Sequence, residues 1–205
     1  MIYKVLDSNG RSYHGGGSAV WSLPVDGQPG AWMPPIEGEL KPCKNGYHLC
    51  SGEEQLVQWL GPEIYEAEYQ SERVDADDKI VVREARLLRR IETWTKKTAR
   101  LFSCDCAERV VRYYEAKYPG DNRPRKSIEI ARRYARGEAT DDELLAAESA
   151  AWYAWYAAES AAGFAAGYAV GSAAGYAWYA GYAAEFAAER RWQAERLGQY
   201  LRGKV

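Results

Sequence analysis

The spacing of hydrophobic and polar residues changes near the middle of the chain. In the first half, "MIYKVL" (1–6) is a short apolar run, apolar residues alternate with polar ones in "EIYEAEY" (63–69), and "KIVVREARLLRRI" (79–91) has a β-branched core. These patterns predict β-strands. The stretch "SGEEQLVQWLG" (51–61) has helical spacing instead, with Ser51 as the expected N-cap. The first half is therefore predicted to combine strands with a short helix.

In the second half the apolar period lengthens to about 3.6 residues, the period of an α-helix. A first helix is predicted over 98–118. A second is predicted over 124–136, because Pro is suited to a first helical turn and Gly137 follows the last one. Thr140 and Glu143 have the spacing of a capping box ahead of a third helical region.

The change of period suggests two domains. A chain of 205 residues is long enough for two small domains, each with its own core. We expect residues 1–95 to form a small mixed α/β domain and residues 96–205 to form an all-helical, Ala-rich C-terminal domain. The predicted fold class is therefore α+β.

The tail at 146–189 has low sequence complexity. Its "AAESAA" motif recurs at an offset of eleven residues, and glycines stand four apart at 163, 167, 171 and 175. This spacing places the glycines on one stripe of a helix, where another backbone can approach closely. Because each Gly costs about 1 kcal/mol relative to Ala in a helix, we expect a kink or hairpin near 171–175. We also expect packing within the chain's own bundle or a homo-oligomer formed through the tail.

Residues 160–184 carry no charge and are long enough to span a bilayer. The segment contains no Leu or Ile, its tyrosines are spread along its length, and Glu159 and Glu185 flank it instead of basic anchors. We therefore predict a water-soluble helix and no membrane partner. The N-terminal "MIYKVLDSNG" (1–10) lacks the basic and apolar regions of a secretory signal, so the predicted location is cytoplasmic.

Charge is distributed unevenly along the chain. The formal net charge of −2 and the pI near 5.8 argue against a uniformly basic nucleic-acid binder. Residues 73–136, however, contain 18 Lys/Arg and 10 Asp/Glu, an excess of 8 positive charges. Such a region can bind phosphates or an acidic protein, or pair with its own carboxylates. The predicted interaction residues here are Arg125, Lys126, Arg132 and Arg133.

The segment "KPCKNGYHLC" (41–50) places two cysteines and a histidine around an Asn-Gly pair. Structural zinc sites use cysteines about two to four residues apart. Neither this pair nor the "CDC" at 104–106 has that spacing, so no metal site is predicted. Asn45-Gly46 is expected to form the turn of a strand-turn-strand corner, with a buried cysteine on either side. The corner residues are Cys43, His48 and Cys50.

"SYHGG" (12–16) resembles the His-Gly corner that holds the nicotinamide ribose in one branch of the ADP-ribosyltransferases. "NGYHLCSGEEQLVQWLGPEIYEAEY" (45–69) resembles the second element of that fold. The resemblance implies NAD as a cofactor, an aromatic ring against the nicotinamide and a carboxylate beside the ribose. The candidate catalytic residues are His14, Tyr47, Glu66 and Glu68. In the structural alternative Tyr47 belongs to the core, His14 lies in a glycine loop and no cofactor is needed.

Two longer resemblances cover nearly the whole chain. Residues 1–92 resemble a domain of unknown function found in bacterial and phage proteins, with matching positions at Cys43, Gly46, Tyr47, His48 and Cys50. The stretch "RLFSCDCAERVVRYYEAKYPGDNRPRKSIEIARRYARGEAT" (100–140) is similar to a helical immunity-protein family whose members end in Ala- and Trp-rich repeats. Neither family supplies an established catalytic residue. Together they imply a prophage or mobile-element setting.

The leading interpretation is a non-enzymatic cytoplasmic inhibitor of immunity or anti-defence type, which binds a host or competitor protein. Aromatic side chains often anchor such interfaces, and the predicted anchors in the tail are Trp152, Trp155 and Trp178. The first alternative is an ADP-ribosyltransferase-like enzyme that modifies a host protein. The second is nucleic-acid binding through the basic middle region.

Overall fold

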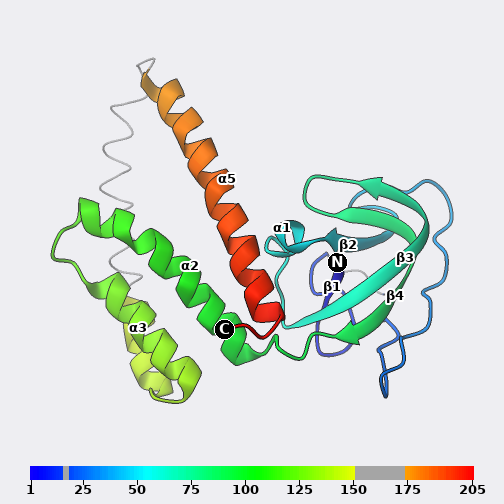
Figure 1. The fold of residues 1–205 in the computed structure, drawn as a ribbon, viewed down its shortest axis with the longest axis horizontal. Coiled ribbons are helices and arrows are strands. Elements are labelled where there is room, and N and C mark those ends of the chain that lie inside the picture. Colours follow the sequence, from blue (N-terminus) through cyan, green and yellow to red (C-terminus); the bar gives the residue numbers. More distant parts are fainter. Residues whose placement is uncertain (16–18, 151–173) are drawn as a thin grey trace. The chain divides into compact units, whose positions relative to one another are not determined.

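A computed structural model describes residues 1–15, 19–150 and 174–205 of the chain (Figure 1). In chain order the elements are β1 (Ile2–Leu6), β2 (Tyr47–Ser51), α1 (Glu53–Leu56), β3 (Glu63–Asp75), β4 (Ile80–Arg90), α2 (Lys96–Lys117), α3 (Arg123–Arg136) and α5 (Ala174–Leu201). Residues 141–150 are also helical. The chain thus combines helices with a sheet, which confirms the predicted α+β class.

The chain groups into two compact units. We call residues 1–95 with 190–205 the barrel unit, and residues 96–189 the helical unit. The last sixteen residues, predicted to belong to the helical domain, group with the strands instead. The described part of 96–205 is also not all helical, because connections at 118–122 and 137–140 interrupt it.

The four strands of the barrel unit form a closed antiparallel barrel in the order β1-β2-β4-β3. Closure comes from β1, which pairs with β2 through Tyr3 and Cys50 and with β3 through Lys4 and Tyr65. The long β3–β4 hairpin contains two register shifts, one of them next to Ala67. Such irregularities bend and twist a hairpin, which allows β3 and β4 to curve around a small interior (Figure 1).

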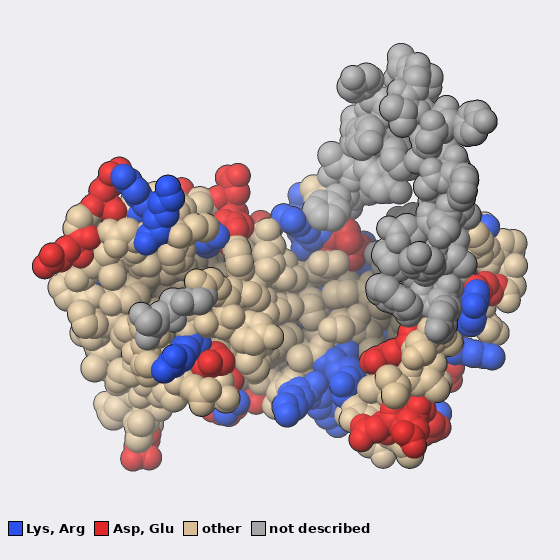
Figure 2. Space-filling model, turned by 180° about the vertical axis from the view of Figure 1, so that it is seen from behind, with Lys and Arg blue, Asp and Glu red and all other residues tan. Residues whose placement is uncertain are grey.

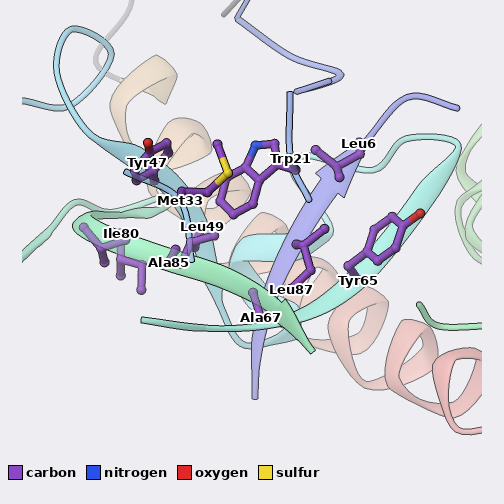
Figure 3. Packing of buried hydrophobic residues seen from close by; sticks show 11 residues of the cluster. Leu6, Trp21, Met33, Tyr47, Leu49, Tyr65, Ala67, Ile80, Ala85 and Leu87 are labelled. Atoms are coloured by element: carbon purple, nitrogen blue, oxygen red, sulfur yellow. The ribbon is translucent and has the colours of Figure 1, made fainter. Parts of the chain in front are cut away.

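Side chains from all four strands fill this interior, and Trp21 and Met33 reach it from the long loop between β1 and β2 (Figure 3). Three N–H groups between residues 30 and 36 donate to carbonyls of β4, which holds the loop along that strand. The loop is therefore a structural part of the barrel. The core consists of Leu6, Trp21, Met33, Tyr47, Leu49, Tyr65, Ala67, Ile80, Val82, Ala85 and Leu87.

The end of α5 belongs to the barrel unit. Leu197 is fully buried, and Thr93 Oγ1 donates a 2.7 Å hydrogen bond to the carbonyl of Leu201. Just beyond the helix, Arg202 Nη1 lies 3.0 Å from Oε1 of Glu53 in α1. The last residues of the chain are thus fixed to the barrel unit by apolar burial, a hydrogen bond and an ion pair.

The helix ends of the helical unit follow the signals in the sequence. α2 and α3 lie within one residue or two of the predicted ranges, and Gly137 ends α3 with φ of 80°. The capping box is present: Thr140 N–H donates to Glu143 Oε2 at 2.8 Å, and Glu143 N–H donates to Thr140 Oγ1 at 3.2 Å. The structure thus confirms these predictions. Helix ends of this kind are predictable because they depend on residues that are close together in the sequence.

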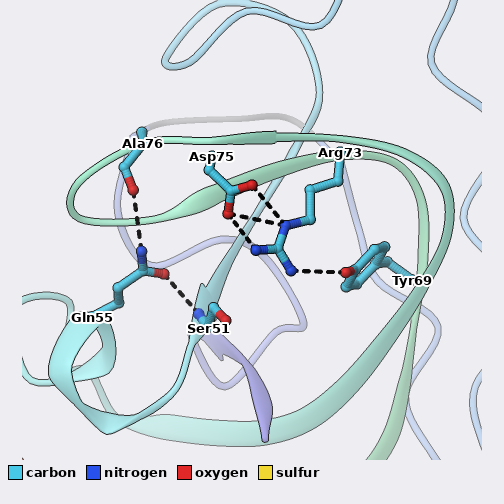
Figure 4. Close-up of polar contacts among 6 residues, drawn as sticks. All are labelled: Ser51, Gln55, Tyr69, Arg73, Asp75 and Ala76. Atoms are coloured by element: carbon cyan, nitrogen blue, oxygen red, sulfur yellow. Dashed lines mark hydrogen bonds and ion pairs between the residues drawn. The ribbon is translucent and has the colours of Figure 1, made fainter.

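The prediction for the helix at 51–61 is wrong in its limits and its cap. α1 is a single turn whose N-cap is Gly52, with φ of 92° and no side-chain capping bond. Ser51 is instead the last residue of β2, and its N–H donates to Oε1 of Gln55 at 2.7 Å (Figure 4). The Gln55 amide also donates to the carbonyl of Ala76, so this side chain links β2 to the β3–β4 turn.

The corner prediction is also corrected. The turn lies between Lys41 and Asn45, whose N–H and carbonyl groups bond to each other, and Cys43 inside it has φ of 61°. Gly46 lies after this turn. A Cβ there would be 2.3 Å from a β4 side chain, so close packing requires the glycine. Cys50 is buried as predicted, whereas Cys43 is exposed.

The predicted glycine stripe and kink in the tail fall mostly at 151–173, outside the described residues. Oligomerisation through the tail therefore stays a prediction. Over the part of the chain that is described, no helix combines the length and the apolar character needed to cross a membrane.

Lys4 is a buried cation of the barrel. Its Nζ donates to the carbonyl of His48 at 3.1 Å and lies 5.1 Å from the ring centroid of Trp21. Burial lowers the pKa of Lys4 from 10.5 to about 8, because the ammonium loses its hydration. The folded chain therefore binds this proton less tightly than the unfolded chain does.

This difference predicts that the Lys4 contribution to stability rises with pH. Between about pH 8 and 10.5 the unfolded chain keeps the proton that the folded chain has released. Lys4→Met removes the buried charge, so the variant should gain stability relative to the wild type at neutral pH. Above pH 8 that relative gain should shrink by up to about 1.4 kcal/mol per pH unit.

Urea unfolding of both proteins across this pH range measures the difference. The raised pKa of Cys50, about 12 because of burial, acts in the opposite direction, and the Lys4 charge also affects it. Both proteins are therefore compared in a Cys50→Ser background, in which this thiol is absent. A stability difference that stays constant with pH would show that Lys4 keeps an ordinary pKa in the fold.

Candidate interaction surface

α3 is a basic helix in which no residue is buried. Its 14 residues include six Lys/Arg and a single Glu. Ile130 and Tyr134, four residues apart, lie on one helical face but are only half-buried. A surface helix is usually held by burial of its apolar face, so α3 needs another source of attachment.

Ion pairs to α2 provide that attachment. Arg132 Nη1 lies 2.7 Å from Oδ1 of Asp105, and its other terminal nitrogen contacts Glu108. Arg125 Nε donates to Oε1 of Glu115 at 2.5 Å. The Arg132 and Asp105 side chains are 23% and 7% exposed, which shields this pair from water. Two of the predicted interaction residues therefore attach α3 to α2.

The other two predicted basic residues differ from each other. Arg133 donates to the carbonyl of Glu138 at 2.8 Å and lies 3.6 Å from the Glu143 carboxylate, so it supports the connection after α3. Lys126 is exposed. Of the aromatic anchors predicted in the tail, Trp152 and Trp155 lie outside the described residues. The backbone of Trp178 is described, but its side chain is not.

Asp121 fixes the start of α3. Its carboxylate accepts hydrogen bonds from Arg123 Nε and Nη2 at 2.8 and 2.6 Å, and from the Tyr114 hydroxyl at 2.7 Å. Arg123 first, and then Tyr114, hold the pKa of the Asp121 carboxyl well below its usual range. The α2–α3 connection is thus joined to both helices by one side chain.

Further positive charges of the basic middle lie on the β3–β4 hairpin, where four arginines pair with carboxylates. The pairs are Arg73 with Asp75, Arg83 with Glu72, Arg86 with Glu68 and Arg89 with Glu66. Figure 4 shows the Arg73 guanidinium between Asp75 and Tyr69. The last three of these pairs join β4 to β3, and pairs across strands stabilise a sheet surface. On the face seen in Figure 2, Lys and Arg accordingly stand beside Asp and Glu.

The four residues of the ADP-ribosyltransferase interpretation have separate surroundings. His14 is exposed, and its Nε2 donates to two carbonyls just after α1, each at 3.0 Å. Tyr47 lies in the barrel core and donates to a loop carbonyl at 2.7 Å, and burial raises its pKa. Glu66 and Glu68 pair with arginines of β4. A role for these residues in binding NAD stays a prediction.

The corner residues are joined by one hydrogen bond, in which the Cys43 N–H donates to Nε2 of His48 at 2.8 Å. Burial, together with the charges of Lys4 and Lys79, lowers the pKa of His48, so its ring is neutral at pH 7. Burial raises the pKa of Cys50 to about 12, which keeps that thiol unreactive. Within the described residues, no three His, Cys, Asp or Glu side chains are grouped to hold a metal ion.

Comparison with known proteins concerns the second half of the chain. The family model described as "Imm-5 like putative immunity protein" matches residues 89–200, more than half of the 205 residues. The chain belongs to this family. No curated protein and no solved structure matches the chain. Family membership gives the chain an immunity-related role and confirms the resemblance of its C-terminal half. The resemblance of the N-terminal half stays a prediction.

The ion pairs of this surface predict a specific loss of stability. Arg132→Met should lower the free energy of unfolding by about 2 to 4 kcal/mol, because the shielded Asp105 loses its guanidinium partner. Arg123→Met is the matched control. The Arg123 side chain is 47% exposed, so the loss there should be about 1 kcal/mol or less. Urea unfolding followed by circular dichroism measures both, and equal losses would contradict a structural role for Arg132.

Proposed function

We propose that the chain is a non-enzymatic immunity protein that binds a host or competitor protein and blocks its activity. Membership of the immunity family supports this role. The structural observation that carries the proposal is α3, a helix with six basic residues and no buried side chain, inside the range that the family shares. Its exposed face provides charge and apolar surface for a partner to cover.

The attachment of α3 favours binding without rearrangement. Arg125 is held by Glu115 yet keeps a side-chain exposure of 48%, and the exposed Lys126 is its neighbour. Tyr134 donates to Asp141, and the guanidinium of Arg100 lies 4.4 Å from its ring centroid. Side chains that are already ordered lose less conformational entropy on binding. The proposed contact surface is therefore preorganised by pairs within the chain.

The chemistry of this surface indicates its partner. Arg and Tyr are common in protein interfaces, and the basic residues are suited to a protein surface rich in Asp and Glu. We further propose that the chain acts in the cytoplasm and counters a defence or competition system carried by a prophage or other mobile element. The ordering of the α3 arginines by carboxylates of the same chain favours a protein partner over a nucleic acid.

A single charge reversal tests this surface. Lys126→Glu leaves the ion pairs of Arg125 and Arg132 intact and places a negative charge on the outer face of α3. We expect affinity for the partner to fall at least about tenfold, because like charges meet across the interface. Lys44→Glu, an exposed position in the barrel unit, is the matched control and should bind as the wild type does.

The partner is first captured from the host with the tagged full chain, then purified and titrated by calorimetry. We expect a one-to-one complex in which the activity of the captured protein is inhibited. Absence of any such complex would contradict the binding function. A complex that is formed equally well by Lys126→Glu would contradict the assignment of α3 and leave the function standing.

The same preparation separates the two alternatives. An ADP-ribosyltransferase would consume NAD, and His14→Ala would abolish that turnover. A nucleic-acid binder would show affinity that falls steeply with salt, because phosphate contacts release counterions. We expect neither NAD consumption nor a steep salt dependence with duplex or single-stranded probes.

A further inference from the structure

His48 holds the turn at 41–45 through a hydrogen bond that requires a neutral ring. The N–H of Cys43 donates to Nε2 of His48 at 2.8 Å. A backbone N–H can only donate, so Nε2 accepts and the proton of the neutral ring lies on Nδ1. Protonation of the ring would make both of its nitrogens donors. The bond to Cys43 therefore exists only while His48 is uncharged.

The turn that this bond holds is strained. Cys43 has φ of 61°, a conformation that residues with a side chain rarely adopt and that persists only where the surroundings impose it. Within the turn, the N–H and carbonyl groups of Lys41 and Asn45 bond to each other. The Asn45 amide also donates to the carbonyls of Glu37 and Glu39, at 2.8 and 3.0 Å. Loss of the bond at Cys43 therefore affects the preceding loop as well as the turn.

The surroundings of His48 oppose a charge on its ring. On β1, Lys4 Nζ donates to the His48 carbonyl at 3.1 Å. Lys79, just before β4, adds a positive charge, which Asp78 reduces from 3.2 Å away. Burial first, and then the two lysines, lower the pKa of His48 from its ordinary value of 6.5.

The turn itself carries two further lysines. Lys41 Nζ lies 2.8 Å from Oε2 of Glu39, and Lys44 is exposed to water. Pairing reduces the effect of the first charge, and the solvent screens the second. The lysines that oppose a charged His48 ring are therefore Lys4 and Lys79, which are both buried.

The lowered pKa of His48 sets the direction of the pH effect. As the pH falls, the unfolded chain takes up a proton on this ring before the folded chain does. The contribution of His48 to stability is therefore complete above pH 6.5. It is lost as the pH falls from there towards the pKa of the folded ring.

We propose that His48 is an acid-operated latch, which keeps the turn at 41–45 closed while its ring is neutral and releases the turn when Nε2 takes up a proton. The proton comes from hydronium in the solvent and returns to it on neutralisation, so the release is reversible. Once Nε2 carries a proton, two donors face each other and the Cys43 N–H has lost its acceptor. The strained backbone of Cys43 then relaxes, and the bonds between Lys41 and Asn45 open with it. The latch lies in the barrel unit and does not depend on the proposed partner binding.

Amide hydrogen exchange of the full chain, resolved by NMR, tests the latch. Each rate is compared with that of an unstructured chain at the same pH, which gives a protection factor without the intrinsic pH dependence of exchange. Between about pH 7.5 and about pH 4.5, protection of the Cys43 N–H should fall at least about tenfold, because the neutral fraction of His48 falls with pH below its pKa. Val82, fully buried in β4, should stay protected, which shows that the barrel remains folded.

Two variants separate His48 from other titrating groups. His48→Gln keeps a side-chain acceptor that does not titrate, so protection of the Cys43 N–H should no longer depend on pH. His14→Gln changes the other histidine of the chain and should retain the wild-type pH dependence.

The ring nitrogens of wild-type His48, observed by NMR, provide a measurement that needs no variant. At neutral pH we expect Nε2 to be unprotonated and Nδ1 to carry the proton. A proton on Nε2 at neutral pH would overturn the proposal. So would protection of the Cys43 N–H that stays constant with pH in the wild type, or that falls equally in His48→Gln.

Discussion

The pairing of β1 with two neighbours is the constraint on which the barrel unit depends. A sheet of so few strands encloses little space once it closes, so large side chains must fill that space completely. Trp21 and Met33 come from outside the strands to do this, and the loop that carries them must then follow β4. Lys4, which shares a face of β1 with Leu6, is enclosed by the same closure. One pairing pattern therefore explains the long loop and the buried amine.

The helical unit is held together in a different way. Apolar burial stabilises the barrel unit, whereas ion pairs between arginines of α3 and carboxylates of α2 attach α3. Ion pairs fix direction better than they add stability. That property suits the proposed contact surface on α3, which requires a defined shape. It also explains why a helix without a buried residue can be ordered.

The sequence predicted those features that neighbouring residues determine. Short apolar runs and alternation predicted three strands, and the capping box at Thr140 and the glycine after α3 predicted helix limits. The pairing of Arg132 with Asp105 was missed, although a signal existed: Asp105, Glu108 and Glu115 recur on one face of α2. Barrel closure was not predictable, because it depends on pairing between distant segments. The positive φ of Cys43 has no sequence signal at all, because that conformation is rare outside glycine.

The return of residues 190–205 to the barrel unit has a topological consequence. The helical unit is an insertion, since the chain leaves one compact body at residue 95 and re-enters it at residue 190. An inserted segment has both ends anchored, so gaining or losing residues within it changes the closure entropy only slowly. A change in the number of Ala-rich repeats therefore costs the barrel unit little closure entropy. An arrangement of this kind tolerates a change of length in the insert better than a change at the points where the insert joins the barrel unit.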